Sequence, residues 1–188
     1  MYKIIALMGK AGSGKDTMMR KVLEKTTDVN EIISCTTRPR REKEIEGVNY
    51  FFLTPEQFGD KVLHDEMLEA TCFNDWFYGT SYDSLRSDVI NIGVFNPTGI
   101  ESLLSRPDVE VKVYYIAAAA KTRLLRQLNR EADPDVNEII RRYGTDEADF
   151  MDLEFDYTIL QNETFEDLEA GVKEILCQTE NIGDTRSN

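Results

Sequence analysis

Short runs of β-branched and other apolar residues alternate along the chain with longer segments whose apolar residues recur at helical spacing. The apolar runs predict strands over residues 2–8, 31–37, 50–53, 88–95, 109–116 and 156–160, with two more between 68 and 82. The longer segments predict helices over residues 15–25, 97–105, 121–130, 134–150 and 164–177. Buried strands that alternate with helices indicate an α/β fold around a mainly parallel sheet.

Residues 34–82 are richer in short strands and are interpreted as an insertion into this α/β core. Within the insertion, Thr54 as N-cap, Pro55 at the first helical position and Gln57 three residues after the cap predict a helix start. The polar end of the chain, residues 181–188, is predicted to be frayed. The 188 residues are therefore expected to fold as one unit.

Acidic side chains outnumber basic ones in this chain. Lys and Arg total 22 and Asp and Glu total 35, which gives a formal net charge of −13. Because nucleic acids and anionic membranes attract cationic proteins, this balance disfavours a nucleic-acid coat or a membrane-surface protein. Three scattered Cys residues and one His disfavour a disulfide framework and a zinc site. We expect a cytoplasmic protein, because no segment is typical of a signal peptide or a membrane span.

A glycine-rich turn joins the first predicted strand to the first predicted helix. It reads Gly9, Lys10, Ala11, Gly12, Ser13, Gly14, Lys15, Asp16 and Thr17. Glycines allow successive backbone N–H groups to face one anion, and the helix N-terminus adds partial positive charge. Since this strand–turn–helix context is that of a P-loop, the turn predicts an ATP-phosphate site in which Lys15 reaches the β- and γ-phosphates.

The residue after Lys15 departs from the P-loop pattern. That position normally holds Ser or Thr, whose hydroxyl binds Mg²⁺, but here it is Asp16, followed by Thr17. The Asp16 carboxylate either stabilises the first helical turn electrostatically or holds Mg²⁺ through water. Asp16 and Thr17 are therefore the candidate Mg²⁺ residues, and both interpretations of Asp16 stay open.

A basic island, residues 36–43, holds four cations in eight residues of this acidic chain. It is either a solvated loop or a second phosphate site, since Arg guanidinium groups match phosphate bidentately. The wider context of the island is Ser34-Cys35-Thr36-Thr37-Arg38, Arg41, Glu44, Gly47 and Tyr50-Phe51-Phe52, with Leu68-Glu69 and Tyr78-Gly79-Thr80 downstream. In this order, these residues resemble motifs of the guanylate kinase family.

The resemblance covers nearly the whole chain and implies a P-loop NTPase fold of three α/β/α layers with a GMP-binding insertion and a helical lid. The implied parts are a core of residues 1–33, 83–120 and 145–180, a GMP-binding subdomain of residues 34–82 and a lid of residues 121–144. The implied reaction is ATP-dependent phosphorylation of GMP or dGMP, with Mg²⁺ as cofactor. A kinase of another (deoxy)nucleoside monophosphate and a catalytically inactive binding module are the alternatives.

The resemblance also implies which residues hold GMP. The phosphate would be bound by Arg38, Arg41, Tyr50 and Tyr78, and the base would be read by Ser34, Glu69 and Thr80. A carboxylate suits guanine because N1–H and N2–H₂ are adjacent donors that one carboxylate accepts together. Adenine offers neither donor in that arrangement, so it would leave the acid desolvated and unpaired.

Two departures from the family pattern bear on this site. Pro39 stands one place earlier than the family's proline, so Arg40 competes with Arg41 for the phosphate role. Asn96 takes the place of an acid near the guanine site, and its amide can both donate and accept, so the base preference stays open. The loss of that acid also removes a usual indirect anchor for Mg²⁺.

Five arginines lie in the predicted lid, in two successive predicted helices: Arg123, Arg126, Arg130, Arg141 and Arg142. Arg126 and Arg130 are predicted to share a helix face, as two lid arginines of the family do, and Arg141 or Arg142 matches a third. The implied catalytic residues are Lys15, Arg126, Arg130 and Arg142, which would neutralise charge on the transferred phosphoryl group. The expected partners are small nucleotides, without a nucleic-acid polymer or membrane, and the protein is expected to be a monomer or homodimer.

Overall fold

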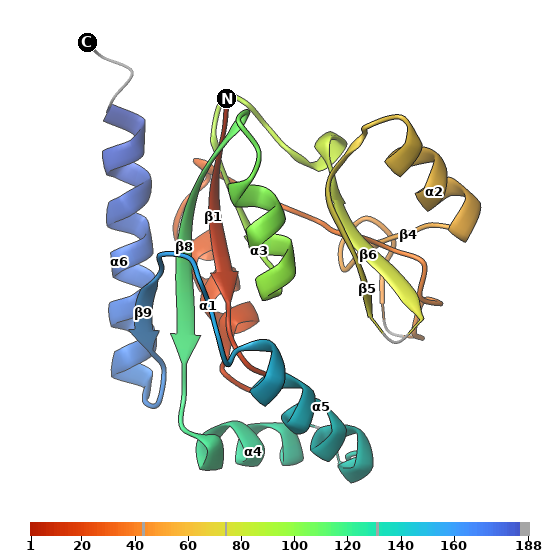
Figure 1. Ribbon diagram of the computed structural model, residues 1–188. Coiled ribbons are helices and arrows are strands. Elements are labelled where there is room, and N and C mark those ends of the chain that lie inside the picture. Colours follow the sequence, from red (N-terminus) through yellow and green to blue (C-terminus); the bar gives the residue numbers. More distant parts are fainter. Residues whose placement is uncertain (43, 74, 131, 185–188) are drawn as a thin grey trace.

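The computed structural model describes residues 1–42, 44–73, 75–130 and 132–184. Its main sheet has the strand order β2-β7-β1-β8-β9, and every neighbouring pair is parallel (Figure 1). The strands are β1 (Tyr2–Met8), β2 (Val29–Glu31), β7 (Ile90–Val94), β8 (Val109–Ala117) and β9 (Thr158–Gln161). The predicted α/β fold is confirmed, and the carboxyl ends of these strands meet at one edge of the sheet.

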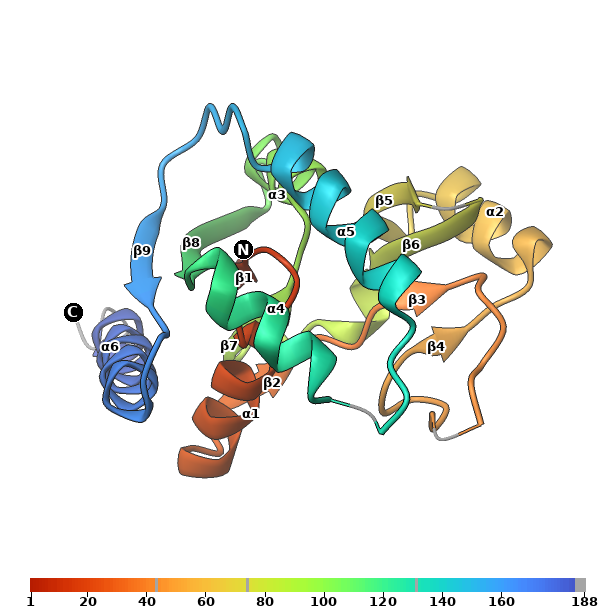
Figure 2. The same cartoon turned by 90° about the horizontal axis from the view of Figure 1, so that it is seen from below.

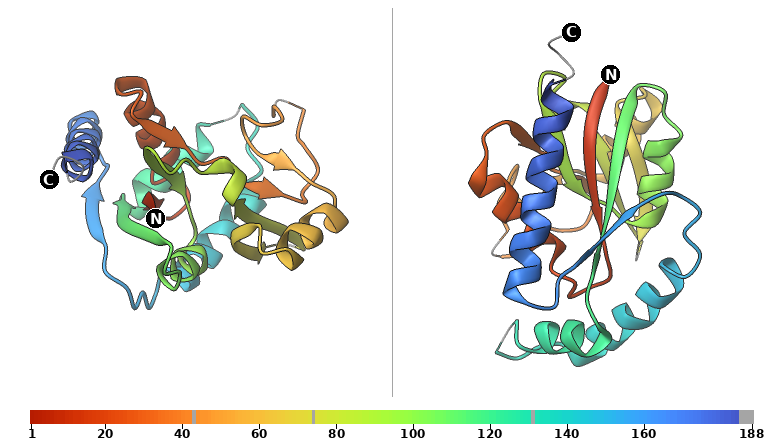
Figure 3. Two further views of the ribbon diagram at one scale, coloured as in Figure 1. Left: turned by 90° about the horizontal axis from the view of Figure 1, so that it is seen from above. Right: turned by 90° about the vertical axis from the view of Figure 1, so that its left-hand side faces the viewer.

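The main sheet is covered on both faces by helices. These are α1 (Lys15–Lys25), α3 (Pro97–Leu104) and α6 (Phe165–Asp184). Ile5 and Leu7 of β1 pack with α1 and α6, whereas Ile4 and Ala6 face the opposite core with α3. Figure 3 shows α6 lying along one face of the sheet. The alternation along β1 therefore produces the predicted three layers.

A second, smaller sheet lies beside this core and has the order β4-β3-β6-β5 (Figure 1). Its elements are β3 (Cys35–Thr36), β4 (Phe51–Phe52), α2 (Pro55–Leu63), β5 (Met67–Phe73), β6 (Trp76–Ser81) and a 3-10 helix (Tyr82–Ser84). The predicted cap of α2 is confirmed. The Gln57 N–H donates to the Thr54 hydroxyl at 3.2 Å, and the Thr54 N–H donates to the Gln57 side chain at 2.9 Å.

The single strand predicted over residues 31–37 is wrong. The chain leaves the main sheet after β2 and enters the small sheet at β3, so this apolar run is divided between two sheets. Ile32 is buried in the core against α3, and Cys35 is buried in the small core of the second sheet. The apolar residues of this segment therefore fill two different cores.

Two helices follow β8 and lie at the carboxyl edge of the main sheet, α4 (Ala120–Leu128) and α5 (Val136–Asp149). Figure 2 shows α4 across this edge and α5 extending toward the small sheet. The predicted helix over 121–130 runs too far, because Asn129 leaves the helical conformation at φ −94°, ψ 0°. Arg130 therefore lies in the turn after α4 and does not share a helix face with Arg126.

The last helix is longer than predicted. Helix α6 continues to Asp184, so residues 181–184 are helical although they were expected to be frayed. No proline interrupts this stretch, and the helix extends by seven residues beyond residue 177, which is about two turns. Residues 185–188 of that expected tail lie outside the described residues. Among the described helices, none combines the length and apolar character needed to cross a membrane.

Candidate active site

The phosphate loop lies between β1 and α1, at the carboxyl edge of the main sheet. Helix α1 begins after Gly14, which provides no side-chain cap, so the first amides of the helix remain available to an anion. Gly12 has φ +79°, and a Cβ there would lie 2.5 Å from the Arg123 carbonyl oxygen. Glycine is required at this position because both the backbone conformation and the close approach exclude a side chain.

Lys15 and Ser13 are two predicted residues of the phosphate loop whose side chains differ in exposure. Lys15 opens α1 and is half-buried beside the loop amides. Ser13 is fully buried, and its hydroxyl has no hydrogen-bond partner in the part of the chain that is described. A buried unpaired hydroxyl within a curl of backbone amides is a group that a bound anion would satisfy.

Arg126 of α4 connects the phosphate loop to the segment after β9. Its guanidinium donates to the Ser13 carbonyl at 3.2 Å and to the Asn162 carbonyl at 2.7 Å, with longer bonds to Gly12 and Glu163. The buried Asn162 side chain completes the connection by donating to the Ser13 carbonyl at 2.7 Å. In this structure the Arg126 guanidinium is therefore occupied by four backbone carbonyls.

A hollow of about 230 Å³ opens beside this connection. Its lining residues come from the loop, α4 and the start of α6 and are Gly14, Thr17, Arg126, Asn162, Glu163, Thr164, Phe165 and Leu168. Phe165 is 64% exposed, and its ring lies 5.1 Å from the Lys21 ammonium. The hollow therefore offers an aromatic face and polar groups next to the phosphate loop.

The predicted base-reading residues Glu69 and Thr80 meet in the small sheet. Glu69 is 9% exposed, Thr80 is fully buried, and the Thr80 hydroxyl donates to the Glu69 Oε1 at 2.8 Å. Burial raises the pKa of Glu69 to about 7, against a smaller opposing effect of the Thr80 hydrogen bonds. The structure thus holds a carboxyl group that exchanges its proton near neutral pH.

Asn96 approaches the same carboxyl from the main sheet. Its side-chain oxygen caps α3 by accepting the Gly99 N–H at 2.7 Å. A Cβ on Gly99 would lie 3.0 Å from the Asn96 oxygen and 3.4 Å from the Glu69 Oε2. The end of β7 and the small sheet therefore bring Asn96 and Glu69 together, as predicted residues of one site.

The predicted phosphate-binding group is also assembled in the small sheet. Arg38 lies 5.6 Å from the Tyr50 ring centre, and the Tyr50 and Tyr78 rings meet edge to face at 6.1 Å. The Arg38 guanidinium is 2.7 Å from the Glu44 Oε1, and this hydrogen bond is the main cause of the lowered Glu44 pKa. Glu44 thus orients Arg38 while the two phenol groups lie beside it.

The remaining predicted residues of the small sheet are less tightly held. The Arg41 N–H donates to the Glu44 carboxylate at 2.8 Å, while the Arg40 and Arg41 side chains are both exposed. The Ser34 carbonyl accepts the Phe51 N–H at 2.9 Å, which fixes the backbone of Ser34 beside β4. Glu44 therefore holds both the Arg38 side chain and the Arg41 backbone.

Electrostatic effects connect this group to the phosphate loop and to α5. Burial raises the pKa of Tyr50, and the Tyr78 hydroxyl and the Asp16 carboxylate add to that increase. The pKa of Glu138 on α5 is lowered chiefly by its hydrogen bond with Arg141, and Arg41 contributes. The loop, the small sheet and α5 therefore act on one another through their charges.

The predicted lid arginines occupy different settings. Arg141 and Arg142 both pair with Glu138 on their own helix, at 2.7 Å and 3.4 Å. Arg130 is exposed in the turn after α4. Arg126 donates to carbonyls of the phosphate loop, so the predicted catalytic arginines Arg126, Arg130 and Arg142 lie in three different surroundings.

The first turn of α1 carries the predicted Mg²⁺ residues, Asp16 and Thr17, and both side chains are exposed. In the described ranges no group of three or more His, Cys, Asp or Glu side chains could hold a metal ion alone. Mg²⁺ in nucleotide enzymes is usually held by one or two protein oxygens together with phosphates and water. A carboxylate and a hydroxyl next to the loop fit that requirement.

Three charged residues around the loop were not assigned to the site from the sequence. Arg123 of α4 is 4% exposed, and it pairs with Glu147 of α5 at 3.2 Å. Glu147 also lies 2.7 Å from the Lys10 ammonium, and the Asp146 carboxylate accepts the Ala11 N–H. Acids on a helix are usually solvated, so no feature of the sequence distinguishes these two acids from an ordinary polar face.

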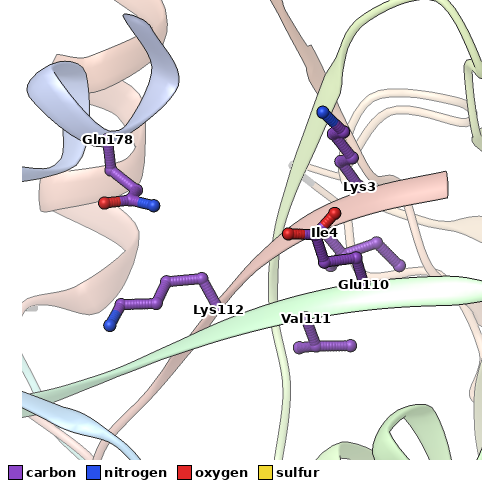
Figure 4. A pocket seen from close by; sticks show the side chains of 6 residues that line it. All are labelled: Lys3, Ile4, Glu110, Val111, Lys112 and Gln178. Atoms are coloured by element: carbon purple, nitrogen blue, oxygen red, sulfur yellow. The ribbon is translucent and has the colours of Figure 1, made fainter. Parts of the chain in front are cut away.

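Another hollow, of about 100 Å³, lies at the opposite edge of the main sheet, where β1 and β8 begin. Figure 4 shows its lining side chains, with Lys112 and Gln178 on one side and Lys3 and Glu110 on the other. It is small and far along β1 from the phosphate loop, so it is not part of the candidate site.

A phosphate loop at the carboxyl edge of a parallel sheet, facing an Arg–Tyr group and a buried acid on an inserted sheet, places this protein in the class of P-loop nucleotide kinases. The family model described as guanylate kinase matches residues 1–179. The chain therefore belongs to the guanylate kinase family.

Individual relatives agree with this assignment. The guanylate kinase of Agrobacterium fabrum is 30% identical over 178 residues, which are 90% of this chain and 81% of the relative. The guanylate kinase of Thermotoga maritima is 30% identical over 173 residues, 88% of this chain and 81% of the relative. The crystal structure of guanylate kinase from Anaplasma phagocytophilum has a TM-score of 0.66 at 21% identity, covering 94% and 85% of the two chains, and supports the fold.

Proposed function

We propose that this protein transfers the γ-phosphoryl group of ATP to GMP, and likewise to dGMP, to give ADP and the nucleoside diphosphate. Membership of the guanylate kinase family supports the reaction. The observation that carries the choice of base is the buried Glu69–Thr80 pair. As a carboxylate, Glu69 would accept guanine N1–H and N2–H₂, and the Thr80 hydroxyl would turn to donate to guanine O6.

The acceptor phosphate would lie against Arg38, Tyr50 and Tyr78. A guanidinium held by Glu44 is fixed in direction before the ligand arrives, which reduces the entropy lost on binding. Arg41, whose side chain is exposed, would add a second guanidinium to the phosphate. Ser34, which directly precedes β3, would also contact the base.

ATP would place its phosphates on the amides of residues 9–17 and its adenine in the hollow beside Phe165. Lys15 would neutralise the β- and γ-phosphates, because an ammonium at this position reaches them from the helix start. Mg²⁺ bound with ATP would supply further charge neutralisation, and Asp16 and Thr17 are the residues that would hold it.

Transfer would be direct and in line, because the attacking GMP phosphate oxygen is already anionic and needs no general base. The protein's part would be to position the two nucleotides and to stabilise charge on the transferred group. Arg130 follows α4 and Arg142 lies on α5, and movement of α5 toward the small sheet would bring them to the phosphates and exclude water.

The test is a coupled ADP-release assay across the common nucleoside and deoxynucleoside monophosphates. We expect GMP and dGMP to be turned over fastest. Fastest turnover of AMP or dTMP would instead identify a kinase of another nucleotide. This alternative arises because Asn96 stands where the family has an acid. Stabilisation by neither ATP–Mg²⁺ nor GMP in thermal unfolding would indicate an inactive binding module.

A further inference from the structure

The end of α5 contacts the phosphate loop through two neighbouring acids. The Asp146 carboxylate accepts a hydrogen bond from the Ala11 backbone N–H. The Glu147 Oε2 lies 2.7 Å from the Lys10 ammonium. Both partners belong to the loop that would receive ATP, so two of its donors are already bound to carboxylates of this chain.

Arg123 completes this group from α4. Its Nη2 donates to the Glu147 Oε1 at 3.2 Å, and its Nη1 lies 3.8 Å from the Asp146 Oδ2. The guanidinium also stacks over the Tyr143 ring at 4.9 Å and is almost fully buried. Two acids and two cations therefore neutralise one another around the loop.

This arrangement opposes the binding of a triphosphate in two ways. A backbone N–H that donates to a carboxylate is withheld from a phosphate oxygen, and an ammonium paired with an acid attracts a phosphate less strongly. The Asp146 carboxylate is also a negative charge at the loop, and like charges at such short range repel strongly where solvent screening is incomplete. Asp146 is mostly buried, with 18% of its side chain exposed.

We propose that Asp146 and Glu147 form a latch that holds α5 on the phosphate loop and that the ATP phosphates displace. The latch consists of these two acids with Lys10, Arg123 and the Ala11 N–H. Displacement would free α5, which carries Arg141 and Arg142, so that the lid moves only after ATP is bound. The inference rests on the proposed function, because it takes ATP as the ligand of the loop.

The experiment compares Asp146→Ala and Asp146→Asn with wild type by calorimetric titration of the full chain with ATP–Mg²⁺. Asn removes the charge and keeps an oxygen that accepts the Ala11 N–H, whereas Ala removes both. If ATP must displace the latch to bind, the Kd for ATP should be about 3 to 10 times lower in both variants than in wild type. Asp149→Asn is the matched control, because Asp149 lies on the same helix and is exposed. Its Kd for ATP should stay within about twofold of wild type.

Titrations with two further ligands, AMP and GMP, distinguish loss of the latch from a general change in the protein's affinity for nucleotides. AMP lacks the β- and γ-phosphates, so its affinity should be unchanged by Asp146→Ala, and the affinity for GMP should also be unchanged. A weaker or unaltered affinity of Asp146→Ala for ATP, or an equal gain in Asp149→Asn, would overturn the latch. If Asp146→Ala does not fold, Asp146→Asn and Glu147→Gln carry the same test.

The outcomes also separate the latch from the proposed function. Wild-type protein that binds ATP while the Asp146 variants gain nothing would refute the latch alone. Absence of ATP binding in wild type and variants alike would refute both the proposed function and the latch. A gain for ATP together with fastest turnover of another monophosphate would keep the latch and refute the proposed base.

Discussion

The Thr80 hydroxyl donates a hydrogen bond to the Glu69 carboxyl at 2.8 Å, and both side chains are buried within the small sheet. A buried carboxylate without a cation loses hydration that one hydroxyl does not replace, which is why the pKa of Glu69 rises to about 7. Guanine would supply two N–H donors to this carboxylate. A base that donates twice would therefore complete the hydrogen bonding of this carboxylate.

Glu69→Gln should weaken GMP binding by about 10²-fold and leave ATP binding nearly unchanged. Gln keeps the size of Glu and one oxygen for Thr80, but its amide nitrogen cannot accept a guanine N–H, and a charged acceptor is lost. Calorimetric titration with each nucleotide measures both affinities. Glu66→Gln is the matched control, since Glu66 is an exposed acid three residues earlier. Equal weakening of GMP and ATP would contradict the base-reading role.

GMP affinity should rise about tenfold between pH 6 and pH 8. With a pKa of about 7, Glu69 is mostly protonated at pH 6 in the free protein, and binding as a carboxylate requires that proton to leave. Above pH 8 the group is already ionised and the affinity should level off. Because the GMP phosphate also titrates, the comparison is with Glu69→Gln, whose pH dependence should be flatter. Parallel pH profiles in the two proteins would exclude Glu69 as the titrating group.

Lys15→Ala should leave the fold intact and lower kcat/KM by about 10²–10³-fold. The residue opens α1, where Ala is a good helix former, so stability is little affected. The loss reflects an ammonium that would stabilise charge on the transferred phosphoryl group. Coupled assay and thermal unfolding measure the two effects. Lys25→Ala, at the exposed end of the same helix, should retain full activity, and unchanged turnover in Lys15→Ala would refute the loop assignment.

The phosphate loop and the cap of α2 could be predicted from the sequence because each is decided by neighbours in the chain. Gly12, Gly14 and Lys15 all lie in one turn, and the side chains of Thr54 and Gln57 form hydrogen bonds with backbone N–H groups at the start of one helix. The division of residues 31–37 between two sheets was not predictable in this way. Local apolar character is the same whether Ile32 and Cys35 fill one core or two.

The interaction partners of charged side chains could not be predicted from the sequence either. Arg126 was expected to face phosphates, yet its guanidinium binds the carbonyls of Ser13 and Asn162, which come from two distant segments. Asp146 resembles any polar residue on a solvated helix until α5 is placed against the loop. Spacing along a helix predicts which residues share a face, but it does not predict what that face meets.

Asp16→Asn should raise the Mg²⁺ concentration needed for half-maximal turnover several-fold. The carboxylate is exposed next to the loop and would hold the ion through water, whereas the amide lacks the charge. Without Mg²⁺ the same variant should bind ATP more tightly than wild type, because Asp16 and the phosphates repel each other. Asp28→Asn, an exposed acid beyond α1, is the control. An unchanged Mg²⁺ requirement would leave Asp16 with only a helix-stabilising role.

Arg126→Lys and Arg130→Lys should differ in their effects although both preserve charge. Lys cannot reproduce the fork by which Arg126 donates to the Ser13 and Asn162 carbonyls, so Arg126→Lys should lower the free energy of unfolding by about 1–3 kcal/mol and weaken ATP binding. Arg130 is exposed after the end of α4, so Arg130→Lys should leave stability unchanged and reduce kcat. Denaturant unfolding measures the change in stability, and steady-state kinetics measures the change in kcat. A loss of kcat without loss of stability in Arg126→Lys would show that this guanidinium leaves the carbonyls and acts on the phosphates.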